Sequence, residues 1–370
     1  MKNICFIVND FNFFYSHRYD LAKTLLVKYN YSVSVICSLS NASLEDVKFC
    51  EENAIQIIHL RHRSEDRGIL KYLINLHRIL KDNQFEQLIF VTLELSLLGA
   101  IFGIFHRENR RIFIISGLGH DYFIKTMKQR LLRKLEKIVF RISTSKKANN
   151  YFVFQNKDDL EIFNNIGILK NYCHTVIFGN GIDIKKFNYS KRTSDEVTFC
   201  YSGRISKAKG IDTLIEAFKL LQERCPSKKI FLKMFILSNK NENDFNFLQD
   251  KNISIFYNLN QTNLIAELHK CNVFVMPSER EGLPKAALEA ASTGMPIIAA
   301  NTTGTKETVE NKVNGWTFEY ANAESLKDCM MNAVENSTRL EEIGKYSRNL
   351  VIEKFELNKI AAEYNNVLSG

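Results

Sequence analysis

The residues from Cys271 to Ala300 constrain the fold of this chain more than any other stretch. The apolar run Val273 to Met276 predicts a buried strand, and Pro284 and Gly294 bound a predicted helix. A second apolar strand follows Pro296. This order predicts one βαβ unit of a parallel sheet, with a charged loop at the carboxyl edge where open sheets bind ligands.

Two carboxylates fall in this unit, and a run of cations precedes it. Glu281 lies in the charged loop and Glu289 on the predicted helix. Carboxylates would oppose a bare phosphate, so we expect both to accept hydrogen bonds from hydroxyl groups, as on a ribose and a sugar. Cations for phosphates stand upstream, in Gly203-Arg204-Ile205-Ser206-Lys207-Ala208-Lys209-Gly210. The N–H groups that open the helix near Gly282 offer phosphate a further seat.

The two segments together resemble family 4 of the retaining glycosyltransferases. Members of that family carry Gly-Arg-x-x-x-x-Lys-Gly and Pro-Ser-x-x-Glu-Gly-x-x-x-x-x-x-Glu-Ala, and both motifs stand here intact. The resemblance implies that Arg204 and Lys209 hold the donor diphosphate, Glu289 the ribose and Glu281 the sugar. It also implies donor contacts from Gly203, Gly282, Leu283, Pro284 and, in the loop after the next strand, Glu307.

The role of Glu281 stays open between two mechanisms. It could act as a nucleophile, as in retaining hydrolases that form a covalent intermediate. The resemblance favours positioning instead, because the family is thought to react on one face with help from the leaving phosphate. The chain has no Asp-x-Asp motif, which the other common transferase fold uses to hold a metal. We therefore expect neither a metal nor a cofactor. The expected donor substrate is a nucleotide sugar, with a UDP-sugar favoured.

Alternating strands and helices predict an α/β fold with a doubly wound parallel sheet in each half of the chain. The resemblance implies the GT-B fold, in which two Rossmann-like domains face a central cleft. We expect an acceptor-side domain at 1–185 and a nucleotide-sugar domain at 186–350. The polar segment from Lys185 to Glu196 is predicted to be a weakly structured linker, and a final helix at 351–370 to pack back on the first domain.

The composition fits a globular protein of two domains. The chain has 370 residues, 45% of them hydrophobic, which suffices for two full cores. Neither a run of 18 apolar residues nor an N-terminal signal peptide is evident, so we expect a cytoplasmic location. The eight cysteines are scattered without Cys-x-x-Cys pairs and read as reduced core thiols.

The first half of the chain carries most of the positive charge. Residues 1–185 hold 26 Lys/Arg against 18 Asp/Glu, a net +8, whereas residues 186–370 hold 24 against 23, a net +1. A predicted helix at 122–142 combines an apolar stripe with cations and one acid, Glu136. Such a helix could lie on an anionic membrane surface, which would make the protein peripheral on the inner face of a bacterial membrane. The alternative is a core-packed helix with a solvated basic face.

Two segments of the first half resemble transferases that extend polyprenyl-diphosphate-linked glycans. The first is Phe13-Phe14-Tyr15-Ser16-His17-Arg18, although Phe11 to Phe14 replace the glycines that many relatives keep in a loop there. We predict a loop at Asp10–Phe14 and a single helix at Ser16–Lys28. The second is Gly117-Leu118-Gly119-His120, which follows a predicted strand. The resemblance implies a lipid-linked acceptor, with His17 and His120 beside the catalytic centre. Each histidine could instead be an ordinary polar residue of a helix start or a loop.

Other functions remain open from the sequence. One is a soluble GT-B enzyme acting on a small acceptor, and another is a nucleotide-sugar epimerase of the same fold. A basic nucleic-acid-binding protein would need aromatics interleaved with its cations or a module signature, and neither is evident, so we expect no nucleic-acid partner. The sequence does not identify the donor sugar, the acceptor sugar or the linkage.

Overall fold

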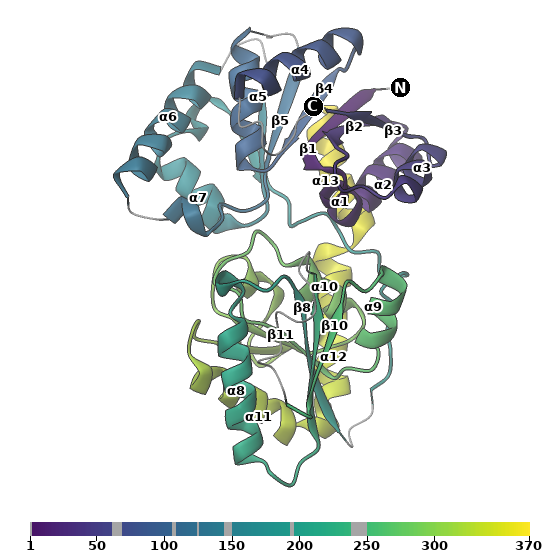
Figure 1. Ribbon diagram of the computed structural model, residues 1–370, viewed down its shortest axis with the longest axis vertical. Helices are drawn as coiled ribbons and strands as arrows, with labels where there is room; N and C mark the ends of the chain where they lie inside the picture. Colours follow the sequence, from purple (N-terminus) through teal and green to yellow (C-terminus); the bar gives the residue numbers. More distant parts are fainter. Residues whose placement is uncertain are drawn as a thin grey trace. The chain divides into compact units, whose positions relative to one another are not determined.

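The computed structural model describes residues 2–60, 69–105, 109–123, 126–143, 150–192, 196–237 and 250–370. The chain divides into two compact units (Figure 1). Unit 1 comprises Met1–Gly181 and Leu357–Gly370, and unit 2 comprises Ile182–Glu356. The chain therefore passes from unit 1 to unit 2 after Gly181 and returns after Glu356, whereas the predicted boundaries are at 185 and 350. Each unit contains one parallel sheet, so the prediction of two Rossmann-like domains is confirmed.

The sheet of unit 1 has the order β3-β2-β1-β4-β5-β6-β7, and all its described pairings are parallel. Along β1, Ile4 and Phe6 enter one apolar layer while Cys5 and Ile7 enter the other. Both faces are therefore buried, as is usual for a parallel sheet. The strands are β1 (Asn3–Asp10), β2 (Ser32–Ser38), β3 (Ile55–His59), β4 (Gln87–Val91), β5 (Arg110–Ile115), β6 (Tyr151–Phe154) and β7 (Cys173–Val176).

Helices cover both faces of this sheet. The first apolar layer contains α1 (Phe11–His17), α2 (Tyr19–Tyr29), α3 (Leu44–Glu52) and α13 (Leu357–Ser369). The second contains α4 (Ile69–Asp82), α5 (Leu93–Phe105), α6 (Met127–Ser143) and α7 (Lys157–Asn165). Two short 3₁₀ turns, η1 (His120–Phe123) and η2 (Leu169–Asn171), complete the unit.

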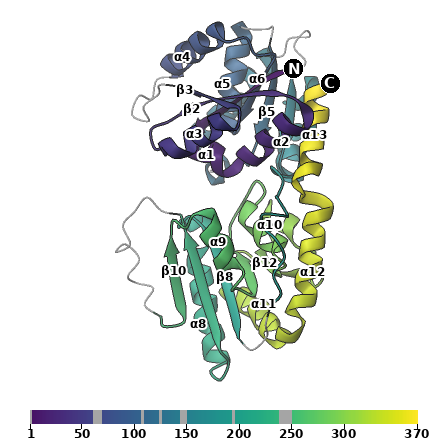
Figure 2. The same cartoon turned by 90° about the vertical axis from the view of Figure 1, so that its right-hand side faces the viewer.

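The helix α13 belongs to unit 1 although it follows all of unit 2 in the chain. It packs beside α2 (Figure 2), and its apolar residues Ile360, Tyr364 and Leu368 recur at helical spacing in the first core layer. The Tyr364 hydroxyl accepts a hydrogen bond of 3.3 Å from Arg18, whose side chain is fully buried. The Gln87 side chain donates to the carbonyl of Leu368 at 2.7 Å. These contacts tie α13 to Arg18, near the start of the chain, and to β4.

The start of the chain differs from the predicted loop at Asp10–Phe14 and single helix at Ser16–Lys28. The helix α1 begins at Phe11, because the Asp10 side chain caps it by accepting from the Phe13 N–H at 2.9 Å. Phe11 and Phe14 are buried in the first core layer. Arg18 then separates α1 from α2. The prediction of a loop was wrong because the aromatic residues form an apolar helix face there.

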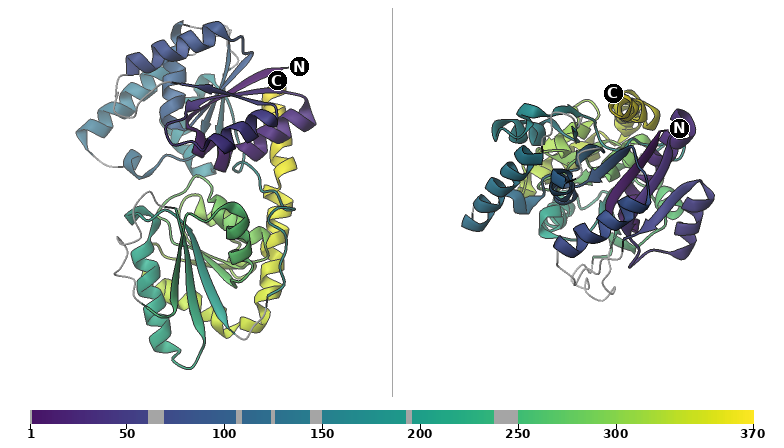
Figure 3. Two further views of the ribbon diagram at one scale, coloured as in Figure 1. Left: turned by 45° about the vertical axis from the view of Figure 1, so that its right-hand side comes forward. Right: turned by 90° about the horizontal axis from the view of Figure 1, so that it is seen from above.

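Unit 2 contains a parallel sheet of order β10-β9-β8-β11-β12-β13, with helices on both faces (Figure 3). Its strands are β8 (Val197–Gly203), β9 (Ile230–Ile236), β10 (Ile253–Tyr257), β11 (Val273–Met276), β12 (Ile297–Ala300) and β13 (Gly315–Phe318). Its longer helices are α8 (Ile211–Arg224), α9 (Gln261–Leu268), α10 (Lys285–Ser292), α11 (Ala323–Glu335) and α12 (Leu340–Leu350). Short turns are η3 (Lys207–Lys209), η5 (Thr305–Thr308), η6 (Ser337–Arg339) and the π-helical η7 (Val351–Phe355).

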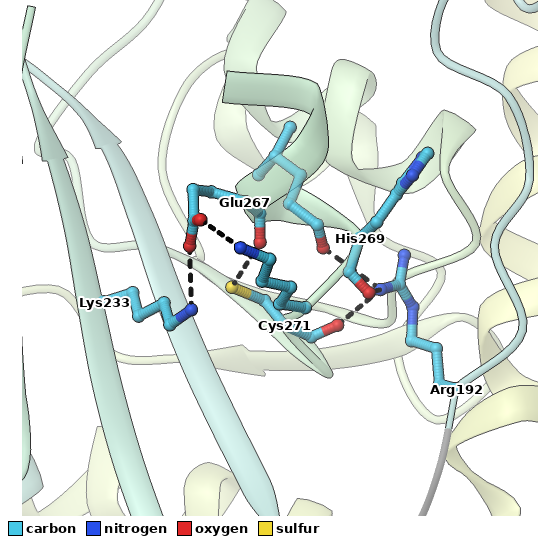
Figure 4. Close-up of polar contacts among 7 residues, drawn as sticks. Arg192, Lys233, Glu267, His269 and Cys271 are labelled. Atoms are coloured by element: carbon cyan, nitrogen blue, oxygen red, sulfur yellow. Dashed lines mark hydrogen bonds and ion pairs between the residues drawn. The ribbon is translucent and has the colours of Figure 1, made fainter. Parts of the chain in front are cut away.

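The described part of the segment predicted to be a loose linker is bound to unit 2 by Arg192. Its buried guanidinium donates to the carbonyl of Cys271 (Figure 4). It also donates to the carbonyls of Leu268 at 3.1 Å and Thr293 at 2.9 Å. A cation is favourable there, because the carbonyls that end α9 lack helical partners. Burial lowers the pKa of Arg192. The segment is therefore part of the domain.

A second polar cluster holds α9 to the sheet beside Arg192. The Glu267 carboxylate of α9 pairs with Lys233 of β9 at 2.8 Å and with Lys270 at 2.5 Å (Figure 4). Burial raises the pKa of Glu267, but the two lysines outweigh it and leave the pKa below its ordinary value. This ion-paired cluster and the Arg192 contacts fix both ends of the loop that leads into β11.

We expect Arg192→Ala to lower the free energy of unfolding of unit 2 by about 3 kcal/mol, because several buried carbonyls would lose their donor. Trp316, the one tryptophan of the chain, lies in β13 and reports unfolding of this unit by fluorescence in urea. The control is Arg339→Ala, which removes an exposed ion pair with Glu342 and should cost no more than about 0.5 kcal/mol. Equal effects of the two changes would show that the Arg192 contacts add no net stability.

Candidate functional site

Three loops of unit 2 meet at the carboxyl edge of the sheet. They follow the adjacent strands β8, β11 and β12 and span residues 203–210, 277–284 and 301–305. Backbone hydrogen bonds join them, from Glu279 N–H to the Ala208 carbonyl at 2.8 Å and from Glu281 N–H to the Thr303 carbonyl at 3.0 Å. The Thr302 hydroxyl adds a bond of 2.9 Å to the Ser278 carbonyl. The predicted donor residues of this unit thus lie on, or directly beside, one connected set of loops.

Two glycines allow the loops to approach this closely. Gly210 has φ +66°, and a Cβ there would lie 2.1 Å from the Pro277 carbonyl oxygen. Gly304 has φ +80°, and a Cβ there would lie 2.3 Å from the Glu281 carbonyl oxygen. Any other residue would be strained and would push a neighbouring loop away. Gly210 is the last residue of the first motif, so the motif serves the packing of the loops as well as any ligand.

The structure joins Lys209 of the first motif to Glu281 of the second. Lys209 Nζ lies 2.5 Å from Glu281 Oε1, and both side chains are largely buried. The Lys209 residue ends η3, directly before Gly210, and Glu281 is held by its backbone bond to Thr303. The pair places one positive and one negative charge side by side at the sheet edge. It can therefore contact a ligand that carries both an anionic group and hydroxyl groups.

Arg204 extends the positive charge of this edge. Its side chain is exposed, directly after Gly203 at the end of β8. The Tyr201 hydroxyl donates to the Arg204 carbonyl at 2.9 Å and so fixes the backbone from which the arginine projects. Burial raises the pKa of Tyr201, and the nearby Glu281 raises it further, so Tyr201 stays a neutral hydrogen-bond donor. Arg204 and Lys209 give this edge two cations.

The helix α10 supplies the second glutamate. Pro284 precedes its first residue and Glu289 lies on its buried side, with 8% of its surface exposed. Lys285 Nζ lies 3.3 Å from Glu289 Oε1. Gly282 and Leu283 are half-buried residues of the loop just before the helix. The N–H groups at the start of α10 therefore open toward the same edge as the loop, as an anion site requires.

The other predicted residues are placed less tightly. Glu307 lies half-buried on η5, after the third loop. His17 ends α1 in unit 1, where its ring stacks on Phe13 with centroids 4.8 Å apart and Nδ1 lies 2.7 Å from the Ser16 hydroxyl. The backbone of His120 begins η1, but its side chain lies outside the described part. The roles predicted for both histidines stay predictions.

Sequence reasoning missed two groups of polar residues at this edge. Lys285 was not predicted, although its spacing of four residues from Glu289 on a helix is the signal for an ion pair. The hydroxyl groups of Thr302 and Thr305, 2.7 Å apart, hold the third loop, and the Thr303 hydroxyl accepts from Arg280. The run of threonines after a buried strand gave no specific signal for these bonds.

Comparison with known proteins places both units in one class of enzyme. Residues 183–350 match the model of the glycosyl transferases group 1, and residues 3–150 match a glycosyl transferase 4-like model. The chain is 28% identical over 287 residues to the capsular polysaccharide biosynthesis glycosyltransferase CapM of Staphylococcus aureus, covering 74% of this chain and 73% of CapM.

Two further proteins are similar over most of the chain. Over 313 residues, 80% of each protein, it is 22% identical to the N,N'-diacetylbacillosaminyl-diphospho-undecaprenol alpha-1,3-N-acetylgalactosaminyltransferase of Campylobacter jejuni. The crystal structure of HepE from Anabaena in complex with UDP-glucose superposes with a TM-score of 0.75 at 16% identity, covering 100% of both chains. This last likeness is one of fold.

We expect Gly210→Ala to lower the free energy of unfolding of unit 2 by about 1–3 kcal/mol, because the methyl group strains the backbone and clashes with Pro277. Urea unfolding followed by Trp316 fluorescence measures the effect. Ala208→Gly, in the same turn, is the control and should cost at most about 1 kcal/mol. An unchanged unfolding midpoint in Gly210→Ala would show that the loops can separate at no cost.

Proposed function

The chain belongs to the GT-B glycosyltransferases that the group 1 and glycosyl transferase 4-like models describe, and we propose that it transfers a sugar from a UDP-sugar to a polyprenyl-diphosphate-linked glycan. The transferred group would be a hexosyl or N-acetylhexosaminyl residue. The reaction would retain the anomeric configuration. The product would serve the assembly of a surface polysaccharide or of a glycoprotein glycan.

The contact between Lys209 and Glu281 carries this proposal. A UDP-sugar presents a diphosphate beside a hydroxyl-rich ring, and this pair presents a cation beside a carboxylate, 2.5 Å apart. Arg204 adds a second cation for the diphosphate, and the N–H groups that open α10 add dipoles. Glu289 would accept bonds from the ribose hydroxyls, Glu281 would position the sugar, and Glu307 would add a weaker donor contact.

The reaction can be written from these groups. The bond between the anomeric carbon and the UDP oxygen breaks, and the acceptor hydroxyl oxygen forms the new bond to that carbon. The acceptor proton passes to the departing phosphate, so atoms and charge balance without another reactant. Preorganised cations usually supply the largest single term where such charge develops, which is the role proposed for Arg204 and Lys209. His17 and His120 are proposed to lie beside the reacting sugar.

Neither a metal nor a cofactor has a step in this scheme. The two cations and the helix amides take the place that a metal on an Asp-x-Asp motif holds in the other common transferase fold. In the described ranges, no three His, Cys, Asp or Glu side chains gather as a set of metal ligands. Added chelator should therefore leave transfer unchanged, and the donor UDP-sugar is a substrate.

Two relatives and the charge of the chain support the proposed acceptor and the proposed site of action. The Campylobacter relative is named for an undecaprenol-diphosphate acceptor, and CapM for capsule synthesis. Residues 1–185 carry a net charge of +8, which suits an anionic surface. We propose a cytoplasmic enzyme that is peripheral on the inner face of the bacterial membrane, with residues 122–142 facing anionic lipid. The direct test incubates the protein with a panel of nucleotide sugars and lipid-linked acceptors and reads the products by mass.

We expect Arg204→Ala and Lys209→Ala each to reduce turnover by about 100-fold or more, because each removes a cation from the developing diphosphate charge. Product formation at saturating donor measures the effect. Lys207→Ala is the matched control, since Lys207 is an exposed lysine of the same turn, and it should retain turnover. Near-wild-type turnover in either site variant would remove that residue from the proposed diphosphate site.

Glu289→Gln should weaken UDP binding by about tenfold or more, because the amide would lose charge-assisted bonds to the ribose hydroxyls. Glu281→Gln should change UDP binding little and mainly lower transfer, because UDP lacks the sugar that Glu281 is proposed to hold. Titration calorimetry with UDP measures both affinities. Equal losses of affinity would overturn the division of roles between the two glutamates.

A further inference from the structure

The helix α6 packs on unit 1 with its apolar stripe facing away from the protein. The stripe is defined by residues at helical spacing on one side of the helix, and their surfaces are largely exposed: Met127 78%, Leu131 60%, Leu135 48%, Ile138 51% and Ile142 59%. In Figure 1, α6 lies at the periphery of unit 1, beside α5. The stripe was predicted from sequence to serve either the core or a membrane. The structure rules out the core.

The opposite side of α6 faces the protein and is largely polar. The Arg133 guanidinium donates to the Tyr122 carbonyl at 3.0 Å and lies 5.7 Å from the centre of the Tyr122 ring. Burial raises the pKa of Glu136, which Arg133 partly offsets. Phe140 anchors this side in the aromatic core. The helix is therefore inverted relative to an ordinary amphipathic surface helix, which buries its apolar stripe.

Cations line one side of the exposed stripe. At 100° per residue, Arg130, Lys134, Lys137 and Arg141 fall next to the stripe on the same flank. Arg130, Lys134 and Arg141 are exposed. The one acid of the helix, Glu136, is on the inward side. The outer surface of α6 thus combines an apolar stripe with a row of cations.

This combination selects an anionic lipid surface over a second copy of the chain. Two antiparallel copies packed stripe to stripe would bring their cation rows together, and two parallel copies would set each row against the other flank of the partner helix. In neither arrangement does α6 offer an outward acid, since Glu136 is on the inward side. A bilayer interface supplies both an apolar boundary for the stripe and anionic headgroups for the cations. The helix has 17 residues, a length of about 25 Å, which suits a helix lying in the interface plane. Among the described residues, no helix is long and apolar enough to cross a membrane.

We propose that α6 docks this protein on anionic membranes by inserting its apolar stripe into the headgroup boundary, with the flanking cations on the lipid phosphates. The inference rests on the proposed function for its purpose, since an acceptor with a polyprenyl tail is held in such a membrane. It goes further because it assigns the attachment to the apolar stripe, which becomes buried in the membrane, and not to charge alone. Part of the membrane binding should therefore remain at high salt concentration. Ionic screening weakens the attraction between the cations and the lipid phosphates but not the insertion of apolar side chains.

The test compares two variants in binding to phosphatidylcholine vesicles with and without phosphatidylglycerol. The stripe variant is Leu131→Gln, Leu135→Gln and Ile138→Gln, and the charge variant is Arg130→Gln, Lys134→Gln and Arg141→Gln. Glutamine keeps the helix propensity in both. Val27→Gln with Leu44→Gln, two exposed apolar residues on α2 and α3, is the control and should bind like the wild type.

We expect the stripe variant to lose binding to anionic vesicles by about 100-fold or more at any salt concentration. The charge variant should lose about 100-fold at low salt and should approach the wild type at about 1 M salt, where screening shortens the reach of charge to about 3 Å. A stripe variant that binds like the wild type would overturn insertion. If the wild type loses all vesicle binding at high salt concentration, the contact is purely electrostatic, and insertion is overturned as well.

A fluorescent probe reads insertion directly. Leu135→Trp in a Trp316→Phe background should shift its emission to the blue on addition of anionic vesicles and be quenched by brominated lipid. An unshifted emission in bound protein would place another surface on the membrane. Self-association of the wild type in sedimentation, abolished in the stripe variant, would assign the stripe to a second copy and overturn the proposal.

Enzymatic assays separate this inference from the proposed function. The stripe variant should retain transfer to a short-chain soluble acceptor and lose transfer to a long-chain acceptor in vesicles. Equal losses on both acceptors would make α6 structural and overturn the docking role. A wild type that inserts but transfers sugar to neither acceptor would overturn the proposed function and leave the docking intact.

Discussion

The close approach of three loops at the carboxyl edge of the unit 2 sheet is the constraint on which the candidate site depends. Parallel strands bring these loops to one edge, but the edge closes only because Gly210 and Gly304 leave no side chain between neighbouring backbones. Lys209 and Glu281 are 72 residues apart in the chain and meet because of that closure. The site's charge pattern is thus a product of backbone packing first and of side-chain chemistry second.

The strands, loops and helix that form the candidate site in unit 2 could be predicted well because their sequence signals are local. Each strand, turn and helix start from Val273 to Pro296 is encoded by apolar runs, a proline and a glycine that act within a few residues. The contact between Lys209 and Glu281 could not be predicted by the same means, because no local rule measures the distance between two loops. The lysine partner of Glu289 was within reach of helix spacing and was overlooked.

Unit 1 was harder to predict because its signals conflict. The aromatic residues from Phe11 to Phe14 stand where a loop was predicted, and their burial with an Asp10 cap makes a helix there. The stripe of α6 shows the limit of periodicity more sharply. A sequence pattern defines which side chains share a face, but only the packing of Arg133 and Phe140 against unit 1 shows that this face points outward. The pattern of polar and apolar residues alone does not determine which face of the helix points outward.

The return of α13 to unit 1 has a consequence for how the chain folds. Part of the first core layer, including Ile360 and Tyr364, is synthesised only after the whole of unit 2. Until α13 is synthesised, the apolar residues of α2 that it contacts lack this partner, and Arg18 lacks the hydroxyl of Tyr364. Unit 2 is continuous in sequence and can close first, which reverses the usual order in which the earlier domain folds before the later one. The contacts that complete unit 1 also join residues that are very far apart in the sequence, and such contacts form slowly.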